Sequence, residues 1–438
     1  MRRTAFMTGH RQDQSPGDTG NMSNSSRKVV VIGAGIVGVS TAIWCQRQGH
    51  EVVLIDRDGP ASGTSFGNAG ILAAYSVVPV TVPGLIQKAP KMAMDPESPL
   101  FMRWSYLLRL MPWLRGYLKH CNVDDVRRIA AALTPILADS LEQHRALSDG
   151  TGAEQFVHAS DYLYVYADKD AYSADRFTWD IRREFNFTWS ELNHDELRQY
   201  DPVYDGGSAG YAANADDHGR ISDPGRYVQS LAAYFQREGG VLKIATVESL
   251  AEKAGQVCGV VTDQGTESCE VAVIASGVWS GAITKQLGVS IPMEAEGGYH
   301  LELINPTSAP ASPAMLASYK FVATPMEGRL RCAGLVEFGG LKSTADRKPL
   351  ELLKRQVQAV YPSLQYERTE EWLGFRPAPI DSIPLIGEFD TLRGVYAGFG
   401  HQHVGLTGGA KTGRVLAALI SGEDPGIDMQ PYRTSRFT

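Results

Sequence analysis

The feature that most constrains the fold is a glycine-rich turn between two apolar runs near the start of the chain. The segment VVVIGAGIVGVSTAIWCQRQGHEVVLID, residues 29–56, places Gly33, Gly35 and Gly38 between a first apolar run and an amphipathic segment. A second apolar run then closes on Asp56. This order predicts a strand, a tight turn, a helix and a second strand, as in a Rossmann-like α/β sheet.

The spacing of the three glycines is typical of a dinucleotide-binding turn. Gly33 allows the turn, Gly35 lets backbone N–H groups approach a pyrophosphate, and Gly38 lets the helix pack close to the strand. The residues expected around the phosphates, at the helix N-terminus, are Gly33, Ala34, Gly35, Ile36, Val37 and Gly38. Asp56 can hydrogen-bond a ribose hydroxyl and would repel the 2′-phosphate of NADP. The turn alone leaves FAD and NAD open.

Composition limits the class of protein. The chain has 438 residues, 43% of them hydrophobic and 21% charged, which is ordinary for a globular protein of two or three domains. Its formal net charge of -7 offers no electrostatic footprint for nucleic acid. The five cysteines are scattered and lack CxxC spacing, so we expect no metal site and no disulfide framework, and a cytoplasmic location.

Two segments bear on targeting. Residues 1–26 are polar and lack the apolar core of a signal peptide, so we expect a disordered leader, with Met22 as a second candidate start. No run of apolar residues is long enough to span a membrane. The segment LFMRWSYLLRLMPWLRGYL, residues 100–118, has two interpretations: a helix pair over the core that breaks at Pro112, or a basic amphipathic element in peripheral contact with the inner face of the cell membrane.

Later segments return to the nucleotide-binding fold. Asp223 and Pro224 predict the start of a helix that ends near Gly239, and residues 263–265 predict a hairpin turn. The run 271–275 is apolar throughout, as in a buried parallel strand, and leads to Ser276 and Gly277. We therefore expect a second close approach of backbone to the ligand there.

The C-terminal segment favours FAD over NAD. A strand at 395–397 leads into a glycine-dense turn, and a helix is predicted from near Thr407 to Leu419. The N-terminus of that helix would point at the ligand in the turn. A reduced flavin carries negative charge on its pyrimidine side, which such a helix end stabilises.

The ordered set of motifs resembles the FAD-dependent D-amino-acid oxidase superfamily, and within it the bacterial D-amino-acid dehydrogenase branch, which includes enzymes of D-proline and hydroxyproline isomers. The motifs are VVVIGAGIVGVSTA, DRDGPASGTSFGNAGIL, GRISDPGRYVQSLAAYFQREGG, VIASGVWS, GFRPAPIDSIPLIG and GFGHQHVGLTGGAKTGRVLAALI. The resemblance extends from Lys28 to about Phe437. It implies bound FAD and oxidation of an amino acid.

The resemblance also implies which residues contact the cofactor. The loop after Asp56 would wrap the diphosphate and ring through Arg57, Ser62, Thr64, Ser65, Asn68, Ala69, Gly70 and Ile71. The remaining contacts would come from Val247, Ala275, Ser276, Gly277, Trp279, Gly374, Arg376, Gly400, His401, Gly405, Leu406 and Thr407.

For the substrate, Arg376 matches the arginine that grips the carboxylate in this family, a task that suits a bidentate guanidinium. Tyr299 and His300 match an aromatic position of the active site, and His401 and His403 lie in the turn expected beside the flavin ring. None of them is expected to act as a catalytic base. Members of the family pass a hydride from the substrate Cα to flavin N5 once the amine is neutral, so the protein chiefly positions the substrate.

The expected architecture is an α/β FAD-binding domain formed by residues 27–80, 205–290 and 365–438. A second, α+β domain formed by 81–204 and 291–364 would carry an antiparallel sheet over the substrate. Tyr162, Tyr164 and Tyr166 alternate and predict a strand with one aromatic face. That face either lines the substrate pocket or packs in the core.

The expected function is FAD-dependent oxidation of a D-amino acid, or of a cyclic secondary amino acid such as D-proline, to the imino acid. The electrons would pass to a quinone, another carrier or oxygen. Two alternatives stay open: a reaction like that of glycine or sarcosine oxidase, and a flavin-binding electron-relay subunit of a larger complex. No nucleic-acid partner is expected, and the oligomeric state is open.

Overall fold

The computed structural model describes residues 26–95 and 97–437. Its first layer is a six-stranded sheet in the order β18-β19-β12-β1-β2-β8. The pairs from β19 to β8 are parallel, and β18 is an antiparallel edge strand. The strands are β1 (Lys28–Ile32), β2 (Glu51–Asp56), β8 (Val241–Ile244), β12 (Val271–Ile274), β18 (Leu385–Glu388) and β19 (Val395–Phe399). The expected Rossmann-like α/β sheet is confirmed, and the expected leader at 1–26 lies, except for Ser26, outside the described residues.

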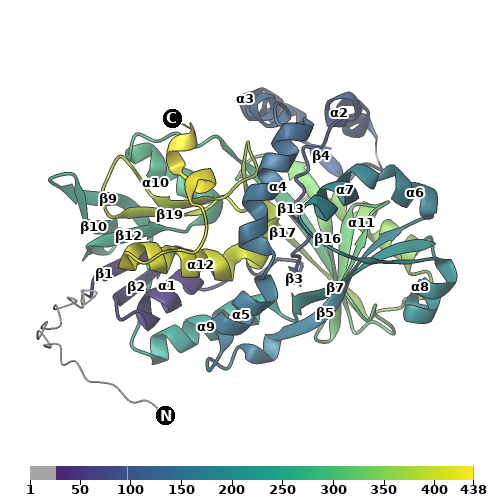
Figure 1. Ribbon diagram of the computed structural model, residues 1–438, viewed down its shortest axis with the longest axis horizontal. Helices are drawn as coiled ribbons and strands as arrows, with labels where there is room; N and C mark the ends of the chain where they lie inside the picture. Colours follow the sequence, from purple (N-terminus) through teal and green to yellow (C-terminus); the bar gives the residue numbers. More distant parts are fainter. Residues whose placement is uncertain (1–25, 96, 438) are drawn as a thin grey trace, which may run out of the picture.

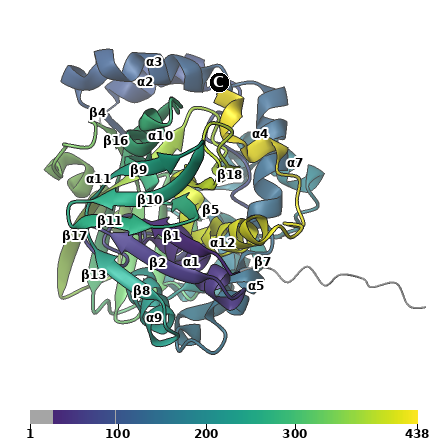
Figure 2. The ribbon, with the colours of Figure 1, turned by 90° about the vertical axis from the view of Figure 1, so that its left-hand side faces the viewer.

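Helices cover this sheet, as Figures 1 and 2 show. α1 (Ile36–Arg47) packs against α12 (Gly405–Ser421) and α9 (Pro224–Arg237), and a small antiparallel sheet adjoins β12. The small sheet contains β9 (Val247–Lys253), β10 (Gln256–Thr262) and β11 (Gly265–Ser268), so the predicted hairpin turn is confirmed. The expected amphipathic character of α1 is wrong. Nearly all of its residues are buried, because helices and sheet enclose it from several sides.

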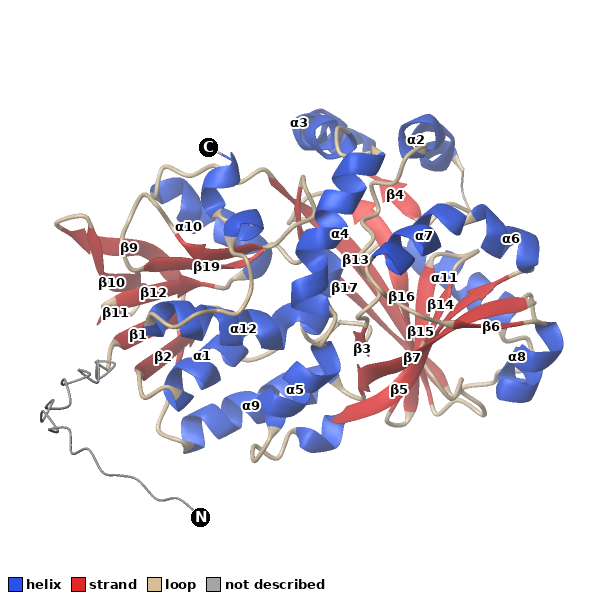
Figure 3. Ribbon diagram, viewed as in Figure 1, coloured by secondary structure: helices blue, strands red, loops and turns tan. Residues whose placement is uncertain are grey.

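The second layer is a ten-stranded mixed sheet in which antiparallel pairs dominate (Figure 3). Its main path is β17-β13-β16-β15-β14-β5-β7-β3, and the pairs β14–β5 and β16–β4 are parallel. The long strands are β5 (Val157–Tyr166), β7 (Tyr211–Ile221), β13 (Met293–Ile304), β16 (Arg329–Phe338) and β17 (Arg368–Pro379). The short strands are β3 (Ile71–Leu72), β4 (Leu100–Met102), β6 (Ser190–Leu192), β14 (Ala314–Leu316) and β15 (Phe321–Met326).

Strand pairing differs from the expected segment boundaries in three places. β3, β7 and β17 belong to the large sheet, although the expected nucleotide-binding part comprises residues 27–80, 205–290 and 365–438. The physical reason is that each of these strands pairs in a ladder of the large sheet at a place where the chain passes between the two sheets: β3 follows β2, whereas β7 and β17 precede β8 and β18. The division into two domains itself stays a prediction.

The large sheet is buried on both faces. Alternate residues of β5 separate into two apolar clusters. One of them includes Leu163, together with Leu301 of β13, and packs under α11 (Arg347–Val360). On the other face, Tyr162, Tyr164 and Tyr166 lie in the main core, and Tyr164 contacts Trp179 of α7 (Arg176–Glu184) edge to face. The aromatic face of β5 therefore packs in the core.

The remaining helices connect these layers. They are α2 (Leu85–Met94), α3 (Leu107–Leu118), α4 (Val123–Leu137), α5 (Ser140–Ser148), α6 (Lys169–Ala174), α8 (His194–Tyr200) and α10 (Ser280–Gln286). The short 3-10 turns are η1 (Trp104–Tyr106), η2 (Glu154–Phe156), η3 (Pro202–Tyr204), η4 (Gly277–Trp279), η5 (Gln402–Val404), η6 (Gln430–Tyr432) and η7 (Thr434–Phe437). Pro112 lies inside α3, so the expected break of a helix pair at this residue is wrong. Within the described residues, no helix has the length and apolar character that crossing a membrane requires.

Candidate active site

The glycine turn is fixed by close backbone packing. Gly33 has a φ of +106°, and a Cβ at this position would lie 2.6 Å from the carbonyl oxygen of Ala275. A Cβ at Gly38 would lie 1.8 Å from the carbonyl oxygen of Gly33. Both positions therefore require glycine, and the end of β12 with Ser276 packs directly on the turn.

The N-terminus of α1 is built to receive a ligand. Its N-cap, Gly35, has no side chain to satisfy the first backbone N–H groups, and Ser65 Oγ accepts from the N–H of Ile36 at 3.0 Å. Asp56 lies beside them, where Oδ2 accepts from the N–H of Ala34 at 2.8 Å. The carboxylate of Asp56 orders the turn in this way and retains lone pairs for a hydroxyl ligand.

The loop after β2 lies against η4. The guanidinium of Arg57 lies 4.4 Å from the ring centre of Trp279, so the two predicted cofactor residues are brought together. Ser62 Oγ donates to the carbonyl of Asp58. Val247 lies at the start of β9, two residues after Ala245, whose N–H donates to the carbonyl of Asp56.

The same loop continues to the start of α12. Residues 64–70 lead into β3, Asn68 Oδ1 accepts from the N–H of Gly70, and the carbonyl of Gly70 accepts from Ile221 of β7. Thr407 Oγ1 donates to the carbonyl of Ile71 at 3.2 Å. The N-cap of α12 is Val404, which has no capping side-chain bond. Gly405, Leu406 and Thr407 therefore place an uncapped helix end beside the loop, as predicted.

These features fit a bound FAD. Two uncapped helix N-termini, a glycine turn that admits no Cβ, and a hydroxyl- and glycine-rich loop converge on the ends of β1, β2, β12 and β19. Helix ends of this kind suit a diphosphate and a flavin that becomes anionic on reduction. Over 26–95 and 97–437, no group of His, Cys, Asp or Glu side chains is placed to hold a metal ion.

Arg376 lies on the large sheet next to this region. Its strand, β17, contacts η4 and η5, which follow β12 and β19. Arg376 pairs across the ladder with Glu296 of β13, and its Nη1 donates to Glu296 Oε1 at 2.6 Å. A Cβ at Gly298 would lie 2.6 Å from the carbon and from Nη2 of the guanidinium. The guanidinium therefore lies flat over Gly298, in space that a larger residue would fill.

His300 lies on the same face of β13 as Glu296 and Gly298. Its ring stacks on Trp372 of β17, with centroids 5.1 Å apart, and its Nδ1 lies 3.0 Å from the carbonyl oxygen of Gly67. Burial and the nearby Arg331 lower the pKa of His300 to about 4. The neutral imidazole therefore donates from Nδ1 to Gly67 and holds the cofactor loop.

Tyr299 is not brought to Arg376. Successive strand residues point to opposite faces, and Tyr299 lies in the cluster under α11, where its hydroxyl donates to Glu337. Burial and Glu337 raise its pKa. The expectation that Tyr299 and His300 share one site is corrected for this reason, since only His300 shares the face of Arg376.

The two histidines of the C-terminal turn also separate. His401 is buried, its Nε2 lies 2.9 Å from Thr412 Oγ1 of α12, and burial lowers its pKa to about 4. The side chain of His403 is exposed, the charges of Glu296 and Arg376 both act on it, and the surrounding protein lowers its pKa. His403, rather than His401, is therefore the histidine near Arg376.

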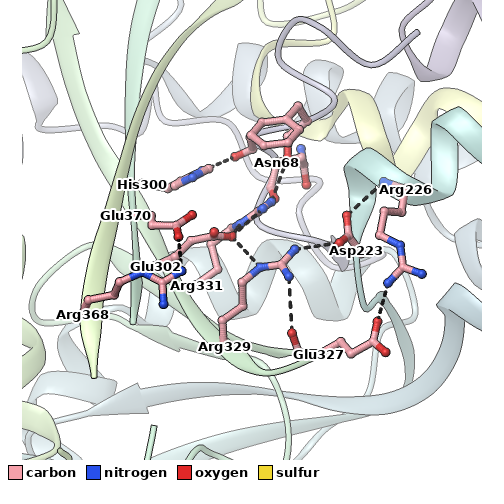
Figure 4. Close-up of polar contacts among 12 residues, drawn as sticks. Asn68, Asp223, Arg226, His300, Glu302, Glu327, Arg329, Arg331, Arg368 and Glu370 are labelled. Carbon is pink, nitrogen blue, oxygen red and sulfur yellow. Dashed lines mark hydrogen bonds and ion pairs between the residues drawn. The ribbon is translucent and has the colours of Figure 1, made fainter. Parts of the chain in front are cut away.

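A chain of buried charges ties the loop to the large sheet (Figure 4). Arg331 is almost wholly buried and donates to the carbonyls of Phe66 and Asn68 at 2.9 and 2.5 Å. Glu302 accepts from Arg331 and Arg329, each at 2.8 Å. Burial alone would raise the pKa of Glu302, but the two arginines outweigh it and hold the pKa below its ordinary value.

The chain of charges ends on α9. Arg329 Nη2 donates to Asp223 Oδ2 at 2.8 Å, and Asp223 Oδ1 caps α9 through the N–H of Arg226. The predicted helix cap at Asp223 is confirmed. Sequence reasoning did not identify its ion pair with Arg329.

Four residues of this region were absent from the predicted site: Glu296, Glu302, Arg331 and Trp372. The alternation of Glu296, Gly298, His300 and Glu302 along one strand is a signal that could have indicated a polar face. Nothing local indicates their partners on β16 and β17. His144 of α5 was also absent from the predicted site. Its Nε2 lies 2.8 Å from the carbonyl oxygen of Leu406 and so holds the start of α12.

Comparison with known proteins agrees with this architecture. The chain is 36% identical over 419 residues to a D-amino-acid oxidase of Bradyrhizobium diazoefficiens, covering 94% of this chain and 99% of the relative. It is 28% identical to a D-amino acid dehydrogenase of Rhizobium rhizogenes, covering 94% and 100%.

Among solved structures, glycine oxidase from Geobacillus kaustophilus superposes with a TM-score of 0.72 at 19% identity, covering 94% of this chain and 99% of that one. L-proline dehydrogenase from P. horikoshii gives 0.70 at 19% identity, covering 94% and 98%. These two likenesses show the fold. A model of the FAD dependent oxidoreductase family matches residues 28–419. The chain therefore belongs to the FAD dependent oxidoreductase family, and FAD is its cofactor.

Proposed function

We propose that the protein oxidises a D-amino acid, or a cyclic secondary amino acid of the D-proline type, to the corresponding imino acid. The observation that carries the proposal is the position of Arg376, whose strand contacts both turns expected at the flavin, η4 and η5. A guanidinium at this place can hold a substrate carboxylate. The names of the relatives from Bradyrhizobium and Rhizobium favour the D-enantiomer.

The chain supplies two sets of groups for FAD. The turn from Gly33 to Gly38 and the N-terminus of α1 would hold the diphosphate, and Asp56 the ribose. Residues 64–71 and the uncapped start of α12 would hold the ring. When bound, FAD would supply the two-electron oxidant that converts the neutral amino acid to its imine.

The roles of the protein in this reaction are to orient and to exclude water. Arg376 would fix the carboxylate and thereby the Cα. Trp372 stacks on His300, and His300 would hold the loop 64–71 beside the flavin. The pKa values of His300 and His403 are lowered by the surrounding protein, so both rings are neutral at pH 7. A linear imine would hydrolyse to the 2-oxo acid and ammonia, whereas a cyclic imine would persist.

The test is a panel of D- and L-amino acids, with glycine and sarcosine, scored by anaerobic loss of the flavin colour. We expect rapid bleaching by a D-amino acid. For Arg376→Ala, we expect the half-saturating concentration of the substrate to rise at least about 100-fold while the flavin stays bound. Arg368→Ala is a matched control, because Arg368 lies on the same strand but is exposed and pairs with Glu370. Bleaching by glycine or sarcosine alone would indicate a reaction like that of glycine or sarcosine oxidase. Persistent colour with every amino acid would indicate a flavin-binding electron-relay subunit.

The electron acceptor is proposed to be a quinone, another carrier or oxygen. A peripheral contact with the inner face of the cell membrane would bring a quinone within reach, and the free state of all five cysteines agrees with a cytoplasmic location. α2 and α3 lie along one margin of the molecule in both Figure 1 and Figure 2. Leu108 and Trp104 are 87% and 65% exposed there, and the segment 80–122 is richer in Lys and Arg than in acidic residues.

The contact is tested by co-sedimentation with vesicles. We expect the holoenzyme to bind phosphatidylglycerol vesicles and to bind phosphatidylcholine vesicles weakly, and Leu108→Ser to weaken the binding. Equal recovery in the supernatant with both lipids would contradict a membrane contact. Release of hydrogen peroxide during turnover would identify oxygen as an acceptor.

A further inference from the structure

Glu296 is a carboxylate placed directly on the proposed substrate arginine. It faces Arg376 across the β13–β17 ladder, and the two side chains keep 15% and 18% of their surface accessible. Glu296 Oε1 accepts from Nη1, while the guanidinium carbon and Nη2 lie over Gly298. Nη1 of Arg376 is therefore paired with Glu296, and both charged side chains keep accessible surface.

Near the pair lie a histidine, a tyrosine and a second carboxyl group. His403 responds to both Glu296 and Arg376, and its lowered pKa leaves it neutral at pH 7. Tyr117 of α3 is buried and feels the charge of Glu296, which together with burial raises its pKa. Glu294, on the same strand, is turned to the hydroxyl of Tyr106 at 3.0 Å. The formal charge of Arg376 and Glu296 together is zero.

A site of one cation and one anion matches a ligand of one anion and one cation. A simple carboxylate bound to Arg376 would leave an uncompensated negative charge in a largely buried site, which is costly. A zwitterionic amino acid leaves none. Its carboxylate and ammonium are attached to the same carbon, so their receiving groups must be neighbours, as Glu296 and Arg376 are across one ladder pair.

We infer that Glu296 binds the substrate ammonium while Arg376 binds the carboxylate, so that the site selects zwitterions over plain carboxylates. The inference rests on the proposed function and deepens it. Glu296 is a specificity residue in this scheme: it binds the ammonium of the resting complex, and the ammonium releases one proton to water before the hydride leaves the Cα, because hydride transfer requires a neutral amine. The alternative is that Glu296 only orients the guanidinium of Arg376, and the two possibilities predict different results for ligand binding.

The experiment compares an amino acid with the same molecule lacking its amino group. The first pair is D-alanine and propionate, and the fastest substrate of the panel with its des-amino carboxylate forms the second. The half-saturating concentration of the amino acid is measured by anaerobic colour loss in the holoenzyme, and the inhibition constant of the carboxylate in the same assay. For Glu296→Gln, we expect the first to rise at least about 10-fold and the second to fall or stay unchanged.

If Glu296 only orients Arg376, Glu296→Gln weakens both ligands by the same factor, and the inference is overturned. Glu294→Gln is the matched control on the same strand, and we expect it to change the ratio of the two constants less than about twofold. If Glu296→Gln loses its flavin, Glu296→Asp provides the test. It keeps the negative charge but places it farther from the substrate, so the ratio of the amino-acid constant to the carboxylate constant should shift in the same direction.

Arg376→Ala separates this inference from the proposed function. We expect it to weaken both ligands. If it changes neither, the proposed site is wrong; if it weakens both while Glu296→Gln moves them in parallel, the site stands and only the role of Glu296 falls.

Discussion

The six-stranded sheet and the large mixed sheet position their functional residues by different means. At the six-stranded sheet, the backbone does so: Gly33 and Gly38 leave no room for a Cβ, and the ligand would meet helix ends. In the large sheet, side chains do so, through the pairs Arg376–Glu296 and Arg331–Glu302. A backbone site depends on local sequence, whereas a side-chain site depends on which strands become neighbours.

The largest effect is expected at the backbone site. Gly33→Ala forces a Cβ into the carbonyl of Ala275 at a positive φ, so we expect a colourless or insoluble protein. Gly49→Ala is the control, because Gly49 has a φ of +86° and a Cβ added there would meet no atom within 4 Å. It should cost about 1 kcal/mol of unfolding free energy and keep the flavin. Flavin absorbance after purification is the measurement, and two equally yellow variants would contradict a steric origin of the turn.

A smaller but substantial effect is expected from the buried charges of the large sheet. Arg331→Met leaves the carbonyls of Phe66 and Asn68 without their donor and weakens the partnership of Glu302, so we expect a loss of about 3–5 kcal/mol in the free energy of unfolding. The measurement is urea denaturation of the holoenzyme. Arg226→Met is the control, since Arg226 and its partner Glu327 are exposed and such pairs contribute at most about 1 kcal/mol. Equal losses in both variants would remove the distinction between buried and exposed pairs.

The smallest effect concerns pH and His144, which connects α5 to α9 and α12. Burial lowers its pKa to about 4, and its ring lies 2.9 Å from the Tyr227 hydroxyl and 2.8 Å from the Leu406 carbonyl. The folded pKa lies below the unfolded value near 6.5, so between these values only the unfolded chain binds the proton. Stability from this group is thus complete above about pH 6.5 and falls towards pH 4, by at most about 1.4 kcal/mol per pH unit. Thermal unfolding from pH 7 to pH 5 should be less pH-dependent in His144→Gln, and an unchanged pH dependence would contradict the assignment.

The sequence was sufficient to predict the parallel strands of the six-stranded sheet, because the patterns that indicate these strands lie within a few residues of each one. The strands β1, β2, β12 and β19, the cap at Asp223 and the start of α12 near Thr407 all follow from patterns within a few residues. The apolar run 271–275 predicted a buried parallel strand, and β12 pairs in parallel with both β1 and β19.

The large sheet and its side of the site could be predicted only in part. A family motif identifies Arg376, but its partner lies 80 residues earlier in the chain, and nothing near Glu296 indicates that pairing. A shared role for Tyr299 and His300 is suggested by their adjacency in sequence, whereas adjacency in a strand separates two side chains onto opposite faces. His401 and His403 show that adjacency in a turn is equally uninformative. The two residues are two positions apart, yet the ring of His401 contacts Thr412 of α12 and that of His403 lies near Arg376.

The register of β13 also limits which sequence changes this family member can tolerate. The ladder with β17 is continuous from Met293 to Ile304, so deleting or inserting one residue between Glu296 and His300 would exchange the two faces for part of the strand. An inserted residue directly after Glu296, for example, would carry the imidazole of His300 into the apolar cluster under α11 and the phenol of Tyr299 onto the face of Glu296. Length variation should therefore accumulate in the connections around this strand, while substitutions inside it adjust ligand choice.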